Sequence, residues 1–315
     1  MVEYNPEVVM KLSACFWASF FLIFQVGIGL VHAQSVAFDD TIRVPQRLIQ
    51  RRVPAMRNMR MLDILKVLYP DTRVVYDDRA GDGNFVRDIQ IVGGPFVFMD
   101  DSGGTRPGPG SIAVLVVEQQ GDDDNENEVD LLPKLAVVGT THARPIPLAS
   151  MELTDYMVTI DPEHDGGSGL KLDSWNIHPS AKAIAVTILR SEAGPEMNNA
   201  TAELSLYFVI DGSLAEVYQT DVLDQTDEKQ DESMYSEQMR VKTSVNDSDI
   251  FNGLRTLDVE NYYSRSENGK LKHVEIDYRR LCWNGDAFDE YCDSPIQKSH
   301  IVKVPNKIPS FRKRK

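Results

Sequence analysis

The densest group of potential metal ligands is an acidic run from Gly121 to Glu128. Calcium binds through several carboxylate and amide oxygens, so this composition could hold the ion. An EF-hand loop beginning at Asp122 would need glycine at its sixth position, where the chain has Asn127. Runs of like charge are typical of solvated loops, and we expect a loop without bound calcium here.

The sequence contains no recognised spacing of catalytic or metal-binding side chains. The chain has no His-x-x-x-His, Cys-x-x-Cys or Gly-x-Ser-x-Gly motif, and no phosphate-binding glycine loop followed by Lys-Ser or Lys-Thr. The acidic cluster around His164, residues 161–165, precedes two glycines and is typical of a polar loop. A carboxylate pair for glycoside hydrolysis could be drawn from any of the many acidic residues. We therefore predict no catalytic residues. The histidines that follow Ala33 are isolated in sequence: His142, His164, His178, His273 and His300.

A second segment rich in Asp and Gly, residues 78–84, precedes Asp88 and a strand-like run to Val92. The segment resembles the calcium loop and strand of FG-GAP and VCBS-type proteins. That resemblance implies a calcium site formed by Asp78, Asp82 and Asp88. The alternative is an Asp/Gly turn between two strands, with no metal.

Aromatic residues gather near the end of the chain, where Trp283 and Phe288 flank Asn284-Gly285. Residues 278–291 resemble the closing hairpin of uncharacterised exported bacterial proteins rich in β-structure. Trp283 and Phe288 could present an aromatic surface to a sugar or a peptide, and we name them as candidate binding residues. The alternative is that both rings cap the core of a sheet.

Two cysteines, Cys282 and Cys292, lie in the same region, and in an oxidising compartment they are expected to form a disulfide. Asn284-Gly285 conflicts with this pairing, because it predicts a two-residue hairpin turn that places Cys282 opposite Ala287. Cys292 would then lie about 16 Å further along an extended strand, beyond disulfide reach. Either the second strand ends early and doubles back, or the hairpin is not tight.

The run from Ala14 to Val31 is apolar, apart from a few polar residues and glycines, and ends at Val31-His32-Ala33. Small residues at this spacing before a polar segment fit a signal-peptidase site, so we predict a signal peptide over residues 1–33. The mature chain then begins near Gln34 and is periplasmic or extracellular. An uncleaved membrane anchor is the alternative, because the run is long enough to span a bilayer. Translation from Met10 would give a more typical signal than translation from Met1.

The composition argues against anionic partners. The chain carries 48 acidic and 33 basic side chains, a net charge of −15, which repels nucleic acid and anionic lipid. We therefore predict no nucleic-acid partner, and no membrane contact after cleavage of the signal. The basic tail, residues 306–315, is the exception to the acidic balance, and we expect a solvated end.

Apolar residues at helical spacing predict one helix from Pro54 to Tyr69. Short β-branched and aromatic runs then predict a series of strands to Leu281. In the last of them, residues 271–281, Val274, Ile276 and Tyr278 alternate with charged residues, as expected for an antiparallel sheet with one wet face. The acidic segment 221–236 is expected to be irregular.

These patterns predict a mainly β fold of antiparallel sheets, either a sandwich or an incomplete propeller, with one N-terminal helix. We place the boundary between two β-rich halves, residues 34–165 and 166–305, in the Gly- and Asp-rich segment near residue 165.

Export, a β scaffold, acidic charge and no recognisable nucleophile favour an exported, non-catalytic β-rich protein, a binding or envelope accessory module. Its partner would be a protein or a glycan. The alternatives are a secreted hydrolase whose carboxylate pair is assembled by folding, and a calcium-stabilised adhesion-type domain.

Overall fold

The computed structural model describes residues 41–77, 85–99, 105–107, 110–121, 129–141, 144–154, 158–160, 169–193, 197–230, 233–290 and 298–300. The predicted signal peptide, the acidic run 122–128, the loop 161–168 and the basic tail lie outside these residues. No helix among the described residues is long and apolar enough to cross a membrane.

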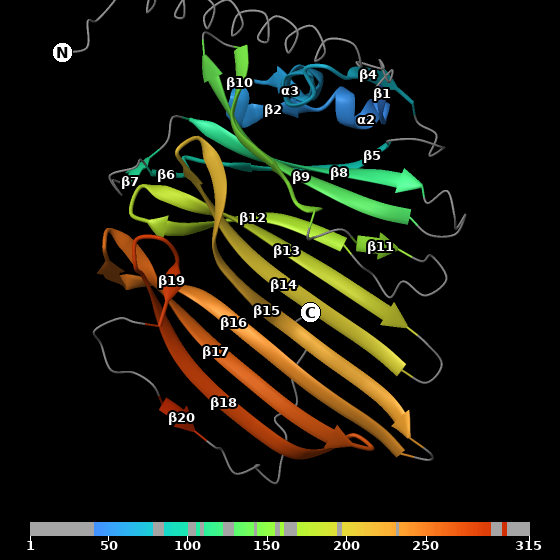
Figure 1. Cartoon of the computed structure of the whole chain (residues 1–315), viewed down its shortest axis with the longest axis vertical. Helices are drawn as coiled ribbons and strands as arrows, with labels where there is room; N and C mark the ends of the chain where they lie inside the picture. The colour runs from blue at the N-terminus through green and yellow to red at the C-terminus, as the bar shows by residue number, and fades with distance from the viewer. Residues whose placement is uncertain are drawn as a thin grey trace, which may run out of the picture. The chain divides into compact units, whose positions relative to one another are not determined.

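Most of the second half of the chain forms one antiparallel sheet, here called the meander sheet (yellow to red in Figure 1). Its strands follow one another in chain order from β12 to β19. Three of its hairpins turn on two residues with positive φ, Asp211-Gly212, Asn252-Gly253 and Asn268-Gly269. Asn-Gly and Asp-Gly suit such turns because glycine adopts positive φ without strain. The strands are β12 (Gly169–His178), β13 (Ala181–Ala193), β14 (Met197–Ile210), β15 (Ser213–Gln230), β16 (Ser233–Phe251), β17 (Leu254–Glu267), β18 (Lys270–Trp283), β19 (Phe288–Asp289) and β20 (Lys298–His300), with β6 (Val97–Met99) and β7 (Thr105–Pro107) added beside β14.

The first half of the chain forms a second sheet, here called the helix-covered sheet, in the order β10-β9-β8-β5-β1-β4. Only β1 forms parallel pairs within it, with β4 and β5. Its strands are β1 (Thr41–Val44), β4 (Arg73–Tyr76), β5 (Phe85–Gly93), β8 (Ser111–Gly121), β9 (Val129–Thr141), β10 (Arg144–Glu152) and β11 (Val158–Ile160). The connection from β1 to β4 contains α2 (Gln46–Ile49), β2 (Arg52–Val53), the 3-10 turn η1 (Pro54–Met56), β3 (Met59–Arg60) and α3 (Met61–Leu68).

The predicted mainly β fold with antiparallel sheets is confirmed. The predicted helix from Pro54 to Tyr69 is wrong at its N-terminal end, because α3 begins only at Met61. Arg57 and Asn58 both have positive φ, which a right-handed helix cannot accommodate. A second short helix, α2, was not predicted.

Strand β8 lies at the centre of the packing. Ile112, Val114 and Val116 face the core shared with α3, while Ala113, Leu115 and Val117 face a core shared with the meander sheet. The side chains of a strand alternate between two faces, and here both faces are covered, which explains the continuous apolar run.

The chain passes from one sheet to the other near the predicted boundary. The last strand of the helix-covered sheet ends at Ile160, and the first main strand of the meander sheet begins at Gly169. Strands β6 and β7 are the exception, because they leave the first half of the chain to join β14. The described residues, which begin at Thr41, group as one compact unit. The division into the halves 34–165 and 166–305 stays a prediction.

One side chain, Gln90 of β5, links the backbones of the two sheets. Its Nε2 donates to the Leu170 carbonyl at 2.7 Å, and its Oε1 accepts from the Leu172 amide at 2.7 Å. The amide of Gln90 therefore pairs with the edge of β12 as a peptide group of a neighbouring strand would. Nε2 also donates to Asp88 Oδ2 at 3.0 Å, which orients the amide.

We predict that Gln90→Ala lowers the free energy of unfolding by about 1–3 kcal/mol, because it leaves a half-buried amide and carbonyl of β12 without their partners. Gln90→Glu should cost more, since a carboxylate cannot donate to Leu170 and lies beside Asp88. The measurement is urea denaturation followed by circular dichroism. The exposed Gln219, which donates to Glu203, supplies the control Gln219→Ala, expected to change stability by less than about 0.5 kcal/mol. Equal effects of the Gln90 and Gln219 variants would contradict the linking role.

Candidate functional site

Three neighbouring strands of the meander sheet present a grid of side chains on one face. Met239 of β16, Tyr263 of β17 and Glu275 of β18 are cross-strand partners and form one row. Val241, Asn261 and Asp277 form the next row in the same way. Because directly paired residues lie on the same face of a sheet, the six side chains share one surface.

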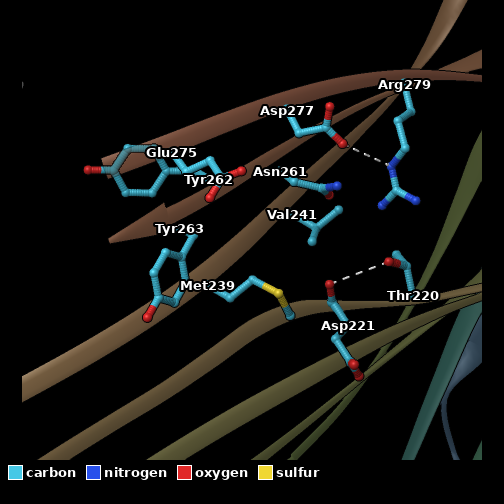
Figure 2. Close-up of a pocket in the computed structure, with 10 residues that line it drawn as sticks. All are labelled: Thr220, Asp221, Met239, Val241, Asn261, Tyr262, Tyr263, Glu275, Asp277 and Arg279. Atoms are coloured by element: carbon cyan, nitrogen blue, oxygen red, sulfur yellow. Dashed lines mark hydrogen bonds and ion pairs between the residues drawn. The ribbon is translucent and has the colours of Figure 1, made fainter. Parts of the chain in front are cut away.

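This grid forms most of the wall of a pocket of about 350 Å³ (Figure 2), here called the β15–β18 pocket. Its volume lies at the lower end of the range of small-molecule sites, about 300–1,000 Å³. In Figure 2 the Met239 and Tyr263 side chains lie together at one end, and Asp277 and Arg279 lie at the other. The lining residues are Thr220, Asp221, Met239, Val241, Asn261, Tyr262, Tyr263, Glu275, Asp277 and Arg279.

Arg279 is held in place at the polar end of the pocket. Its Nη1 donates to Glu290 at 2.7 Å, and its Nε lies 3.5 Å from Asp277 Oδ2. With the Asn261 amide oxygen turned toward Arg279, that oxygen accepts from Nε at 3.1 Å and from Nη2 at 2.6 Å. In this orientation of the Asn261 amide, all three guanidinium nitrogens have protein partners, and the amide nitrogen faces away from Arg279.

The pocket lies where the apolar core on this face of the meander sheet ends. On the same face, toward the other end of these strands, Val259, Leu257 and Leu281 belong to a buried core. Trp175 and Ile177 of β12 pack in that core. The grid lies at the edge of this core. Val241 is still buried in it and Met239 packs against it, whereas the other four grid side chains, on β17 and β18, are half-buried or exposed. Because the strands extend past the residues that cover them, the sheet leaves an ordered surface that is accessible to solvent.

Of the three predicted calcium ligands, Asp88 alone lies among the described residues. Asp78 and Asp82 lie outside them, as do the acidic run 122–128 and the cluster around His164. Asp88 lies in β5, where its carboxylate accepts from the Ile89 amide at 2.8 Å and from Gln90. Within the described ranges, no group of three His, Cys, Asp or Glu side chains could hold a metal ion. Calcium binding at Asp78, Asp82 and Asp88 stays a prediction.

Trp283 and Phe288 are buried, which corrects their assignment as a binding surface. They are only 3% and 7% exposed and pack on Phe208, with ring centroids 5.4 and 6.3 Å from its ring. Their own rings lie 5.6 Å apart. The alternative given above, that both rings cap the core of a sheet, describes this cluster.

The hairpin around Asn284 is wider than predicted. Trp283 pairs with Phe288 and Cys282 with Asp289, so four residues form the loop in place of two. Asn284 Oδ1 accepts from the amides of Asp286 and Ala287, both at 2.9 Å, which stabilises the longer turn. Cys292 itself lies outside the described residues.

Sequence reasoning missed the pocket, although its signal was present. The alternation in residues 271–281 placed Glu275, Asp277 and Arg279 on one face, which was interpreted only as a solvated surface. The structure puts these residues on the face that carries Leu281 in the core, while Tyr278 on the opposite face is 41% exposed. The alternation separates the two faces but does not show which one a second layer covers.

A second polar cluster lies between α3 and the helix-covered sheet. The hydroxyl of Tyr69, at the end of α3, donates to Glu118 of β8. Lys134 Nζ lies 4.5 Å from the centroid of the Tyr69 ring and 3.5 Å from the Leu68 carbonyl. Lys134 is also the cross-strand partner of Glu152.

Burial raises the pKa of Glu118, and Glu152 adds to this effect, although the Tyr69 hydrogen bond and Lys134 act in the opposite direction. Burial also raises the pKa of Tyr69. Each side chain therefore loses its proton less readily than in water. The side chains of this cluster contact one another, so we assign the cluster a structural role in holding α3 to the sheet.

Comparisons of the chain with models of known protein families, with curated proteins and with solved structures find no match.

We predict that Glu118 makes the protein less stable as pH rises. Its folded pKa is above its unfolded value near 4.5, so the folded state binds more protons in that window, and stability falls from about pH 4.5 up to the folded pKa. Glu118→Gln keeps an acceptor for Tyr69 and removes this contribution. The measurement is the free energy of unfolding from pH 4 to pH 8. The control is Glu203→Gln, at a half-buried carboxylate of β14, and it should follow the wild-type curve. A Glu118→Gln curve parallel to wild type would show that Glu118 does not contribute.

Proposed function

We propose that the protein is an exported, non-catalytic binding module whose ligand site is the β15–β18 pocket. The observation that carries this proposal is the pocket itself, a hollow with an apolar end and a polar end on the face of a regular sheet. Small-molecule sites combine such an apolar lining with a few placed polar groups.

The polar groups of the pocket are organised before any ligand arrives. Asn261 and Asp277 are adjacent on paired strands, and both contact Arg279. Arg279 is anchored in turn by Glu290. A site whose side chains are already ordered loses less conformational entropy on binding, which favours recognition.

A hydrolase is the second candidate, because Glu275 and Asp277 lie on one face of β18, two residues apart. That spacing separates their Cα atoms by about 7 Å, so their carboxyl groups can reach the separations of about 5–9.5 Å that glycoside hydrolases use. A general acid must keep its proton, which burial in an apolar site allows. The Glu275 side chain is 50% exposed and Asp277 is ion-paired with Arg279. These surroundings favour binding over catalysis.

The export proposal rests on the apolar run from Ala14 to Val31 and the small residues at its end. An oxidising compartment would also explain a Cys282–Cys292 disulfide. The wide hairpin supports this pairing, because Cys292 follows the cross-strand partner of Cys282 by three residues, about 10 Å if extended. The chain would have to turn back after β19, which ends at Asp289, to bring the cysteines within the roughly 7 Å that a disulfide needs.

We predict that the exported protein contains the Cys282–Cys292 disulfide and that reduction destabilises it. Closing this loop of eleven residues restricts the unfolded chain by about 3 kcal/mol in the entropy model. Thiol titration of unreduced, denatured protein should find no reactive thiol from this pair, and Cys292→Ser should lower the melting temperature as reduction does. Two reactive thiols per mature chain would contradict the bond.

We predict that small probes bind at the β15–β18 pocket. In a methyl-labelled protein, a fragment library containing neutral, cationic and anionic members should shift the Met239 methyl signal saturably. The methyl of Met234, which is 44% exposed, serves as the surface reference and should not shift. Tyr263→Ala should abolish the Met239 response. Tyr278→Ala, which removes an exposed tyrosine from the other face of β18, should preserve it. A library that moves neither methyl, or both equally, would contradict the proposed site.

A further inference from the structure

We infer that the ligand of the β15–β18 pocket is a neutral sugar residue, an inference that rests on the proposed function. It depends on three properties of the pocket: the ion pair of Arg279 and Asp277, the apolar end, and the polar side chains that can form hydrogen bonds.

Paired charges disfavour an anionic ligand. Arg279 is the one cationic side chain among the described lining residues. It donates hydrogen bonds to Asn261 and Glu290 and forms an ion pair with Asp277. An anion would have to share Arg279 with the carboxylates of Asp277 and Glu290, which already offset its charge. It would also be repelled by Glu275 and Asp277.

Cationic ligands are disfavoured for the complementary reason. Asp277 is paired with Arg279, so a second cation would compete with a guanidinium that is tethered beside it. Glu275 is half exposed, and its Oε2 lies 3.8 Å from His273 Nε2. An ion pair at so exposed a carboxylate contributes little, because water screens it.

The other end of the pocket offers an apolar surface of limited size. Met239 and Val241 are neighbouring positions on one face of β16, and Tyr263 is the cross-strand partner of Met239. The Tyr263 and His273 rings pack at an interplanar angle of 61°, with centroids 5.8 Å apart, which restricts the orientation of the tyrosine ring. This surface combines an aromatic ring with small aliphatic groups. The C–H face of a sugar ring can pack on such a surface.

The polar lining groups of the pocket include both acceptors and donors, which suits hydroxyl groups. Asp277 and Glu275 carboxylates accept hydrogen bonds, and the Asn261 amide nitrogen donates on the side away from Arg279. The Thr220 hydroxyl donates to the Asp221 carbonyl at 3.4 Å and can still accept. A hydroxyl both donates and accepts hydrogen bonds. Two neighbouring hydroxyls of a sugar can therefore donate to a carboxylate and accept from an amide at the same time.

The test titrates the full mature protein with named probes and follows the Met239 methyl signal. The neutral probes are cellobiose and N,N′-diacetylchitobiose, the anionic probe is digalacturonate and the cationic probe is tetramethylammonium. We expect at least one neutral disaccharide to bind saturably and the two charged probes to bind at least tenfold more weakly.

Two variants connect this binding to named groups. Tyr263→Phe, which keeps the ring, should bind within about threefold of wild type, and Tyr263→Ala should lose at least tenfold. Asn261→Asp keeps an oxygen toward Arg279 and removes the donors, so it should also lose at least tenfold. Tyr278→Ala is the matched control and should not change affinity.

The outcomes separate the ligand class from the site. Saturable binding of a neutral disaccharide with this variant pattern supports the inference. Tighter binding of tetramethylammonium or digalacturonate at Met239 overturns the sugar assignment and leaves the pocket as the site. No response to any probe or fragment overturns both. Release of reducing sugar from a bound disaccharide would show the hydrolase instead of a binding module.

Discussion

Gln90 satisfies the open edge of β12 with a side chain where a regular sheet would use another strand. A backbone amide and carbonyl that are partly removed from water are costly unless they are paired, so this one amide determines where the meander sheet can approach β5. Asp88 fixes which end of the amide donates and which accepts. Lys182 reinforces the approach, because its backbone amide donates to the Pro95 carbonyl and its Nζ to the Gly93 carbonyl. The apolar core between the sheets, centred on Leu115, depends on this alignment.

The same alignment determines where the core of the meander sheet ends. Strands β15 and β16 contain 18 and 19 residues, whereas β12 contains 10. A short covering strand cannot extend over the whole length of long ones, so the distal part of the sheet keeps its hydrogen-bonded backbone but loses its apolar cover. Tight Asn-Gly and Asp-Gly turns hold the long strands in register. The β15–β18 pocket is the consequence, an exposed surface with the rigidity of a sheet.

Much of this fold could be predicted from the sequence, and the failures have physical causes. Alternation identified the half-buried strands because burial on one face repeats every second residue. Helical spacing around Met56 and Met59 predicted a helix that positive φ at Arg57 and Asn58 prevents. The charges of the segment 221–236 predict an irregular stretch, yet residues 221–230 belong to β15 and residues 233–236 to β16. Its backbone pairs with neighbouring strands, and its charged side chains need only solvent.

The candidate site was harder to predict than the fold, because its residues are defined by pairing across strands. Met239, Asn261 and Asp277 lie far apart in the chain, and nothing in their local sequences indicates that they share a face. The two polar clusters also look alike in composition, each combining tyrosine, carboxylates and a cation. They differ in what surrounds them. Tyr69 and Glu118 face each other between α3 and a sheet, so their hydrogen bond stabilises the packing. Arg279 and Asn261 face each other at the wall of a hollow, so the same kind of contact orients groups toward a ligand.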